Sequence, residues 1–588
     1  MSAPSLLFRA ARPMPRHALS RRCPGVSVIV GISGASQRGL ATKAVQAAVA
    51  APSQGSPARQ FDLPPPSSKN PKPKDGGTIA SVFASLSGEG EAILPERFAE
   101  LKRSIIRSPQ RAQLLKKAFS EVLVSLDSEL NKVIQHGNRL IPQIQYPGNE
   151  AVNLPVHKWL DAEQLREVKK RGSVIVKGVI PEQTALAWKE HIRDYVRANP
   201  STRGFPDDNP QVFELYWSQA QLAARSHPSF LATSRAFLSL FHAPAQKAPS
   251  SSASTQPPTS LTASTSIPLT YADRLRIRLP GDSAFALGPH IDGGGIERWE
   301  CPSFRGCWSK VLGPSEGGDF DVHQSQRLAW EEHDSWSLGP NGERLSARTD
   351  MYDGPGQCGV FRPWQGWLSM SRTAPSEGTL KVLPLLKETT AYIVLRPFFK
   401  SIMQPGDVAA KNADGSWSSA YLSPENWKLD TESSDFPGCT LGRNIELNEN
   451  THPHLKLDRS MLSIPEVGPG DVALWHCDLV HAVEAQHTGA PGKDSSVMYI
   501  PAIPLTKMNA QYVASQANAF RAGIPPSDFP GGAGETSFVG RGKPEEVKGE
   551  EARAAMGLGP IPIRKDMGHA ELELVREANA LFANAAKS

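Results

Sequence analysis

Cysteine is scarce in this sequence, since 588 residues contain only six and no two of them have the CxxC spacing. This scarcity argues against a zinc knuckle and against the disulfide framework of a small secreted domain, and it fits a reducing compartment. Long apolar runs are missing as well, because none approaches the roughly 20 residues that a transmembrane helix needs. The sequence therefore predicts no membrane span.

Net positive charge is nearly absent once the start of the chain is set aside. The formal net charge is +5, but residues 1–40 contain six arginines and no acidic residue, so removing them leaves −1. A nearly neutral body lacks the basic surface that binds phosphate backbones. We expect no nucleic-acid partner, and the sequence leaves the oligomeric state open.

The first forty residues are rich in Arg and Ser and free of acid, a composition typical of a mitochondrial transit peptide. The stretch QRGLAT resembles a matrix-protease site with cleavage between Leu40 and Ala41. Residues 1–40 are thus predicted to direct the protein to the mitochondrial matrix. The alternative is a disordered basic arm on a cytoplasmic protein. Residues 41–90 are Ala, Pro, Ser, Gly and Lys, which predicts a disordered linker.

Helical patterns flank the middle of the chain. Residues 91–150 form a predicted helical segment, in which Ser108 can cap a helix that starts at Pro109 and ends at Gly137. A β-branched strand is expected at 173–181 and a helix at 181–200. Residues 508–588 form a predicted C-terminal helical extension.

From residue 271 the pattern changes to short strands separated by Gly and Pro turns. With no helices alternating between them, such strands favour an antiparallel sandwich or barrel of the jelly-roll kind. We therefore predict an all-β core with helical additions over 151–507, with a low-complexity surface insertion at 243–268. The predicted strands are RLRIRLPGD, FRPWQGWLSMS, GTLKVLPLL, AYIVLRPFF, GDVALWHCD and SSVMYIPAIP.

The stretch ALGPHIDGGG places His290 and Asp292 two residues apart, so that in an extended segment both side chains point the same way. A 2-His-1-carboxylate iron site needs such a pair and a second His from a distant strand. PGDVALWHCDLVHAV supplies His481 after an apolar strand. His476 and Asp478 could instead form a local metal set with His481, although the place of His476 inside the strand favours a packed histidine.

The segments GPHIDGG, FRPWQGWLSMSRTAPSEGTLKVLPLL and PGDVALWHCDLVHAV, in this order, resemble Fe(II)/2-oxoglutarate-dependent oxygenases of the phytanoyl-CoA hydroxylase-like type. From about residue 95 to 560, including NAQYVASQANAFRAGIPPSDFPGG, the chain resembles the YbiU-like family, a divergent branch of these enzymes. The resemblance implies a cupin-like double-stranded β-helix, Fe(II) held by His290, Asp292 and His481, and 2-oxoglutarate and O2 as co-substrates.

The sequence departs from the oxygenase pattern at one point. These enzymes usually hold the far carboxylate of 2-oxoglutarate with an Arg shortly after the distal His, and AVEAQHTGAPGKDSSVMYIP contains none. Lys493 is the one basic residue there, in a Gly/Pro loop that is expected to be exposed. On another strand Arg362 is the favoured candidate, with Gln365 further in. Arg276 and Arg278 rank below them.

The predicted function is oxidation of a small-molecule substrate by an Fe(II)/2-oxoglutarate-dependent dioxygenase. A non-catalytic jelly-roll protein that binds a metal or ligand is the alternative, and the missing Arg is the best argument for it. A metal-dependent hydrolase or a cupin isomerase is a weaker third possibility.

Overall fold

The computed structural model describes residues 93–148, 150, 152–243, 263–283, 286–314, 328–339, 341–354 and 357–587. The predicted transit peptide and the predicted linker lie outside these residues. All described residues belong to one unit that spans residues 68–588. No helix within them combines the length and the apolar character that a membrane crossing requires.

Two sheets form the centre of the fold. The larger has eight strands in the order β1-β2-β14-β8-β16-β6-β4-β3, and the smaller has five in the order β12-β7-β15-β9-β13. Along the chain, β6 to β9 alternate between the two sheets, and so do β13 to β16. Within each sheet these eight strands pair antiparallel. Each of these strands therefore lies in a different sheet from the strand that follows it in the chain.

The strands of the larger sheet are β1 (Gln143–Gln145), β2 (Ser173–Lys177), β3 (Gly204–Phe205), β4 (Val212–Phe213), β6 (Leu275–Arg278), β8 (Trp364–Ser369), β14 (Val472–His476) and β16 (Ser495–Tyr499). Those of the smaller sheet are β7 (His290–Ile291), β9 (Leu380–Val382), β12 (Ile445–Glu446), β13 (Leu462–Ser463) and β15 (His481–Val483). Two further antiparallel pairs join β10 (Phe399–Ser401) to β11 (Trp427–Leu429) and β5 (Ala263–Leu269) to β17 (Ile503–Thr506).

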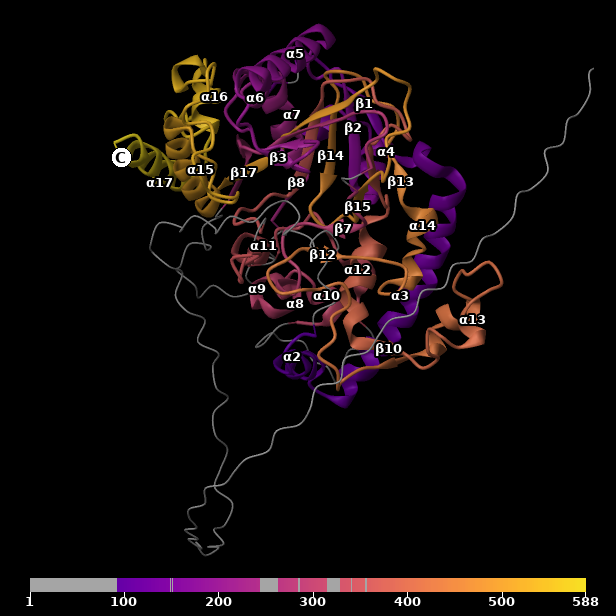
Figure 1. Cartoon of the computed structure of the whole chain (residues 1–588). Coiled ribbons are helices and arrows are strands. Elements are labelled where there is room, and N and C mark those ends of the chain that lie inside the picture. The colour runs from indigo at the N-terminus through magenta and orange to yellow at the C-terminus, as the bar shows by residue number, and fades with distance from the viewer. Residues whose placement is uncertain are drawn as a thin grey trace, which may run out of the picture. The chain divides into compact units, whose positions relative to one another are not determined.

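Helices cover the sheets and fill the connections between strands. Figure 1 shows α15, α16 and α17, in yellow, grouped beside β17, and the long indigo helix α3 running next to α12. The longer helices are α2 (Arg97–Ile106), α3 (Pro109–His136), α4 (Ala162–Arg171), α5 (Glu182–Ala198), α7 (Pro228–Leu238), α12 (Leu386–Leu395), α15 (Lys507–Ala522) and α17 (His569–Ala585). The shorter ones are α6 (Gln219–Arg225), α8 (Glu297–Glu300), α9 (Pro302–Gly306), α10 (Ser309–Leu312), α11 (Glu343–Ser346), α13 (Ser419–Leu422), α14 (Leu457–Ser460) and α16 (Glu550–Ala555).

Helix α3 confirms the prediction made from its ends and its apolar spacing. The side chain of Ser108 accepts a hydrogen bond from the backbone N–H of Arg111, Pro109 occupies the first turn, and Gly137 ends the helix with a positive φ of 62°. The apolar stripe is buried, including Leu115, at 0% exposure. Local signals suffice here because cap, first turn and end all agree.

Two local predictions are wrong. The run AYIVLRPFF forms the second half of α12 and a 3-10 turn, and only its last residue, Phe399, belongs to a strand, β10. A short run buried on all sides has no periodicity that separates a helix from a strand. The predicted insertion at 243–268 ends too late, since residues 263–268 belong to β5, which pairs with β17. Its Ser- and Thr-rich sequence looks like a loop, and only the remote partner strand reveals it. The rest of the insertion, residues 244–262, lies outside the described residues.

The prediction of an all-β core is also too simple. Between β6 and β16 the chain contains seven helices, α8 to α14, within the described residues. The structure is a mixture of helices and sheets. Most of the helices in this stretch are only four or five residues long, too short to give the 3.6-residue periodicity that a sequence pattern needs.

Candidate metal centre

Two neighbouring strands of the smaller sheet carry the predicted histidine ligands. His290 begins β7, His481 begins β15, and the two residues pair directly across the antiparallel strands. Directly paired residues point to the same side of a sheet. The two imidazole rings accordingly lie with their centroids 4.1 Å apart. Strand pairing thus brings together two histidines that are distant in the sequence.

Asp292 completes a compact cluster with these histidines. Its Oδ2 lies 3.4 Å from Nε2 of His481, and its Oδ1 lies 3.8 Å from Nε2 of His290. One ligand atom from each residue lies within 4.8 Å of the others. Both histidines are buried, whereas Asp292 is partly exposed. The three predicted ligands therefore converge on one place.

Hydrogen bonds to the backbone orient both imidazoles. Nδ1 of His290 lies 2.7 Å from the carbonyl oxygen of Gly288, and Nδ1 of His481 lies 3.0 Å from that of Leu479. A carbonyl oxygen only accepts, so Nδ1 must donate in each ring, and a neutral ring then keeps the lone pair on Nε2. When both rings are neutral, as metal binding requires, both Nε2 lone pairs face Asp292. Two lone pairs and a carboxylate in contact repel one another unless a cation lies between them, so the donor set fits a divalent metal ion.

The electrostatic setting favours the protonation states that a metal needs. Burial, with a smaller contribution from His481, lowers the pKa of His290 to about 4. Burial alone would raise the pKa of Asp292, but its contact with His481 and the nearby charge of Arg362 outweigh burial and hold that pKa below its usual range. At neutral pH the site therefore presents a neutral imidazole at His290 and an ionised carboxylate.

A second set of contacts fixes Asp292 itself. Asn444 donates from Nδ2 to Oδ1 of Asp292 at 2.7 Å, and Arg298 donates to its backbone carbonyl at 3.2 Å. The following glycines permit these approaches. Gly294 has a φ of 94°, and a Cβ at Gly295 would lie 2.6 Å from the carbonyl oxygen of Arg443. The glycine run after Asp292 therefore lets the segment with Asn444 pack against Asp292.

The candidate co-substrate residues lie in different places. Arg362 is close to the cluster, with Nη2 4.0 Å from Oδ2 of Asp292. Gln365 pairs across β8 and β14 with Trp475, whose ring centroid lies 5.3 Å from that of His481. Within the described part of the chain, Lys493 makes no contact with the cluster.

The side chain of Lys493 is instead 53% exposed, and its Nζ pairs with Glu377 at 3.1 Å. This agrees with the exposed Gly/Pro loop expected from the sequence. The role of each of these residues toward a co-substrate stays a prediction.

His476, Cys477 and Asp478 form a second group with potential ligand atoms close together. Their polar atoms are already engaged. Nε2 of His476 donates to the carbonyl of Ser335 at 3.0 Å, and its Nδ1 accepts from the backbone N–H of Asp478 at 3.0 Å. The carboxylate of Asp478 binds two arginines. His476 has no lone pair left for a metal, which confirms it as a packed histidine.

Comparison with known proteins agrees with the inferred resemblance to the YbiU-like family. The model of the family described as Gig2-like matches residues 92–558. This chain belongs to the Gig2-like family. It is similar to the uncharacterized protein YbiU of Escherichia coli strain K12, with 26% identity over 79% of this chain and 96% of YbiU. The predicted relationship to YbiU is confirmed.

Solved structures show the same fold in the Gig2-like family. GlcNAc Inducible Gene 2 (GIG2) of Candida albicans is 26% identical and has a TM-score of 0.68, with 84% of this chain and 97% of GIG2 covered. The non-heme α-ketoglutarate-dependent carbocyclase SnoK reaches a TM-score of only 0.29 at 12% identity, which is too low to carry an argument.

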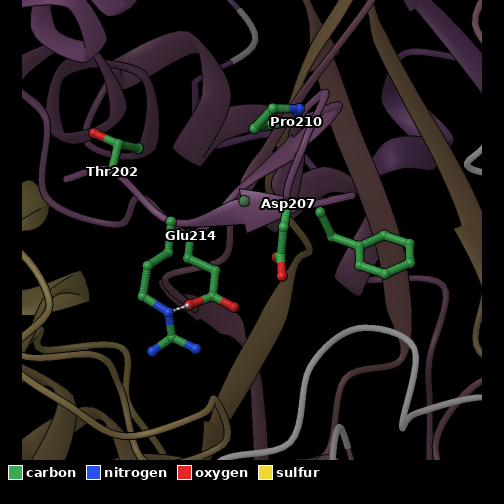
Figure 2. A pocket seen from close by; sticks show the side chains of 7 residues that line it. Thr202, Asp207, Pro210 and Glu214 are labelled. Atoms are coloured by element: carbon green, nitrogen blue, oxygen red, sulfur yellow. Dashed lines mark ion pairs between the residues drawn. The ribbon is translucent and has the colours of Figure 1, made fainter. Parts of the chain in front are cut away.

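A small pocket of this Gig2-like chain lies at the edge of the larger sheet, beside β3 and β4. Its volume is about 140 Å³, and seven residues between Thr202 and Glu214 line it. Figure 2 shows Asp207 and Glu214 at this pocket and the ion pair of Arg203 with Glu214, in which Nε and Oε2 are 3.3 Å apart. None of the three predicted metal ligands lines this pocket, so we do not regard it as the metal site.

Sequence analysis missed three residues that support the cluster. Asn444 and Arg298 donate hydrogen bonds to Asp292, and the ring of Trp475 lies against that of His481. Asn444 lies in a segment without any motif, and Arg298 follows the glycine run as an ordinary helical residue. No local signal marks either of them. Trp475 immediately precedes His476 in an apolar strand, where core packing is the default expectation.

Proposed function

We propose that this protein is an Fe(II)- and 2-oxoglutarate-dependent oxygenase that oxidises a small-molecule substrate. The observation that carries the proposal is the convergence of two imidazole Nε2 atoms and one carboxylate from β7, β15 and the residue after β7. Two neutral histidines and one carboxylate on one face of a metal are the donor set of non-haem Fe(II) oxygenases.

The order of the strands supports the same proposal. A chain whose antiparallel strands alternate between two sheets, as β6 to β9 and β13 to β16 do, resembles the path of a double-stranded β-helix. We propose that these eight strands form a cupin-like jelly roll and that the Gig2-like family is a divergent branch of the oxygenases with this fold. In such a fold the metal lies between the sheets.

The residues of the chain would bind and orient the reactants. His290, Asp292 and His481 would hold the metal from one side and leave its other side to the co-substrate and O2. When bound, Fe(II) lets 2-oxoglutarate and O2 oxidise a C–H bond of the substrate to an alcohol, with succinate and CO2 as the other products. The buried rings around His481 would keep bulk water away.

A direct test uses the purified protein without O2. Addition of Fe(II) and then 2-oxoglutarate is expected to give a weak visible charge-transfer band, because the 2-oxo acid must chelate the iron to produce it. Admission of O2 is then expected to release succinate, measured by mass spectrometry. A protein that binds Fe(II) and gives neither band nor succinate would contradict the proposal. It would favour the alternative of a non-catalytic metal-binding protein. The lack of an Arg between His481 and Tyr499 is the sequence argument for that alternative.

We also propose that the protein acts in the mitochondrial matrix, on the basis of the arginine-rich, acid-free residues 1–40. The mature chain is then expected to begin at or near Ala41. Mass spectrometry of the native N-terminus in a mitochondrial fraction measures this directly. A cytosolic protein that retains residues 1–40 would show that the segment is not a transit peptide.

A further inference from the structure

Strand β6 carries two arginines that are buried without a carboxylate partner. Arg276 is 2% exposed and Arg278 is 0% exposed, and both side chains leave the strand on the same side because they are two residues apart. Within the described residues neither guanidinium forms an ion pair with a carboxylate. A buried charge without a counter-charge is costly, so each of these arginines needs an explanation.

Arg278 is explained by the backbone around it. Its Nη1 donates to the carbonyl of Glu484 at 2.7 Å, and its Nη2 donates to the carbonyls of Asp282 at 2.8 Å and Ala485 at 3.3 Å. These bonds tie the loop after β6 to the loop after β15. Arg278 therefore has a structural role.

Arg276 lacks such a set of acceptors. The carbonyl of Gly378, 3.2 Å from Nη2, is the one acceptor that we find for it among the described residues. Its Nε is buried and has no hydrogen-bond partner in the structure. A guanidinium has five N–H donors, so most of the hydrogen-bonding capacity of Arg276 is unused.

Strand register shows which way Arg276 points. Arg276 pairs with Val497 on β16, and Val497 pairs with Ser369 on β8. Paired residues share a face, and Gln365 lies on this face too, since it is four residues before Ser369 on the same strand. Arg276 and Gln365 therefore project from the same face of the larger sheet.

That face is the one turned toward the candidate metal centre. Gln365 pairs with Trp475, and the ring of Trp475 lies against that of His481. Nε1 of Trp475 and Oδ1 of Asn444, which is bonded to the ligand Asp292, are also buried without a partner. Unused polar atoms thus gather around the centre, as expected where a polar ligand binds.

Arg276 contacts the turn that leads into β9, a strand that pairs with His481. The Gly378 carbonyl that Arg276 contacts lies four residues before Val382, the partner of His481 on β9. A ligand that reaches from the metal toward Arg276 would need an anionic group at its far end.

We propose that Arg276 binds the far carboxylate of the 2-oxo diacid co-substrate, in place of the missing Arg on β16. Arg276 lies on the neighbouring strand, opposite Val497, so its guanidinium projects from the face where an Arg of β16 would lie. The inference rests on the proposed function, because the other end of the diacid must chelate the metal. A carboxylate would supply the charge and the acceptors that Arg276 lacks.

The arginine and lysine favoured from the sequence fit this role less well. The guanidinium of Arg362 already lies between two carboxylates, 4.0 Å from Asp292 and 3.9 Å from Asp273. Its charge is therefore balanced without a ligand. Lys493 is exposed and paired with Glu377.

The test compares two 2-oxo acids on the Fe(II)-loaded protein without O2. 2-Oxopentanoate has the same five-carbon chain as 2-oxoglutarate but lacks the far carboxylate. Titration of the charge-transfer band gives a dissociation constant for each acid. The wild type is expected to bind 2-oxoglutarate at least about tenfold more tightly, and Arg276→Met is expected to bring the two constants close together by weakening 2-oxoglutarate alone.

Arg362→Met and Arg278→Met serve as controls. Metal-free Arg276→Met is expected to unfold at the same temperature as the wild type or higher, since it removes an unpaired buried charge, whereas Arg278→Met is expected to unfold at a lower temperature because it leaves buried carbonyls without donors.

Three outcomes would overturn the inference. The first is that Arg276→Met still prefers 2-oxoglutarate over 2-oxopentanoate. If Arg362→Met lost this preference, Arg362 would be the anchor. A wild type that binds both acids equally would show that no anchor exists. A wild type that binds Fe(II) and neither acid would remove the proposed function itself, and is thereby distinguishable from a wrong anchor.

Discussion

Asp292→Ala is expected to lower the affinity for Fe(II) by more than about a hundredfold while the protein stays folded. Removal of a ligand should exceed the roughly 10- to 100-fold effect of losing a group that merely orients one. The two imidazoles that remain lie close together, and without the carboxylate a bound cation would lose its only anionic ligand in the cluster. Metal content after dialysis and titration with Co(II) as a spectroscopic probe measure the loss, and circular dichroism checks the fold.

His476→Ala is the matched control, because His476 belongs to the neighbouring group with potential ligand atoms. Its ring is enclosed by Phe241 and Trp336, and both of its nitrogens are hydrogen bonded, so the substitution should reduce stability without releasing the metal. His481→Ala should release it. If His476→Ala lost the metal and His481→Ala retained it, the metal would belong to the second group and our assignment would be wrong.

The cluster of candidate ligands was predictable from the sequence because its geometry is partly local. His290 and Asp292 are two positions apart in an extended segment, and the apolar strand before His481 marks a buried strand end. Helix α3 was predictable for a similar reason, since its cap and its end are written in adjacent residues. In both cases no distant contact is needed to recognise the element.

The features that sequence analysis missed depend on distant contacts. Strand β5 forms by pairing with β17. Residues 391–395 are buried as part of α12, which packs against α3. Sequence analysis ranked Arg276 low because the argument for it is that no carboxylate of the described residues pairs with its guanidinium. Such an absence can be seen only when all neighbours are placed.

Arg298, Asp478 and Arg344 form a buried ionic cluster that links the two halves of the candidate metal centre. Asp478 lies three residues before His481 and binds Arg298 at 2.8 Å and Arg344 at 2.7 Å. Arg298 also donates to the carbonyl of Asp292 at 3.2 Å. The segment that carries one histidine is thereby tied to the segment that carries the carboxylate, and all three charged side chains are at most 5% exposed.

Asp478→Asn is therefore expected to reduce the free energy of unfolding by about 3–5 kcal/mol, because it leaves two buried guanidinium groups without a counter-charge. We also expect a loss of metal affinity of roughly tenfold, since the two ligand segments are no longer held together. Urea denaturation of the metal-free protein measures the first effect, and Co(II) titration measures the second. Glu466→Gln at the exposed ion pair with Arg372 should change the unfolding free energy by less than about 1 kcal/mol. If Asp478→Asn lowered the unfolding free energy no more than this control does, other groups would have to balance the charges of Arg298 and Arg344. The ionic cluster would then not be responsible for aligning His481 with Asp292.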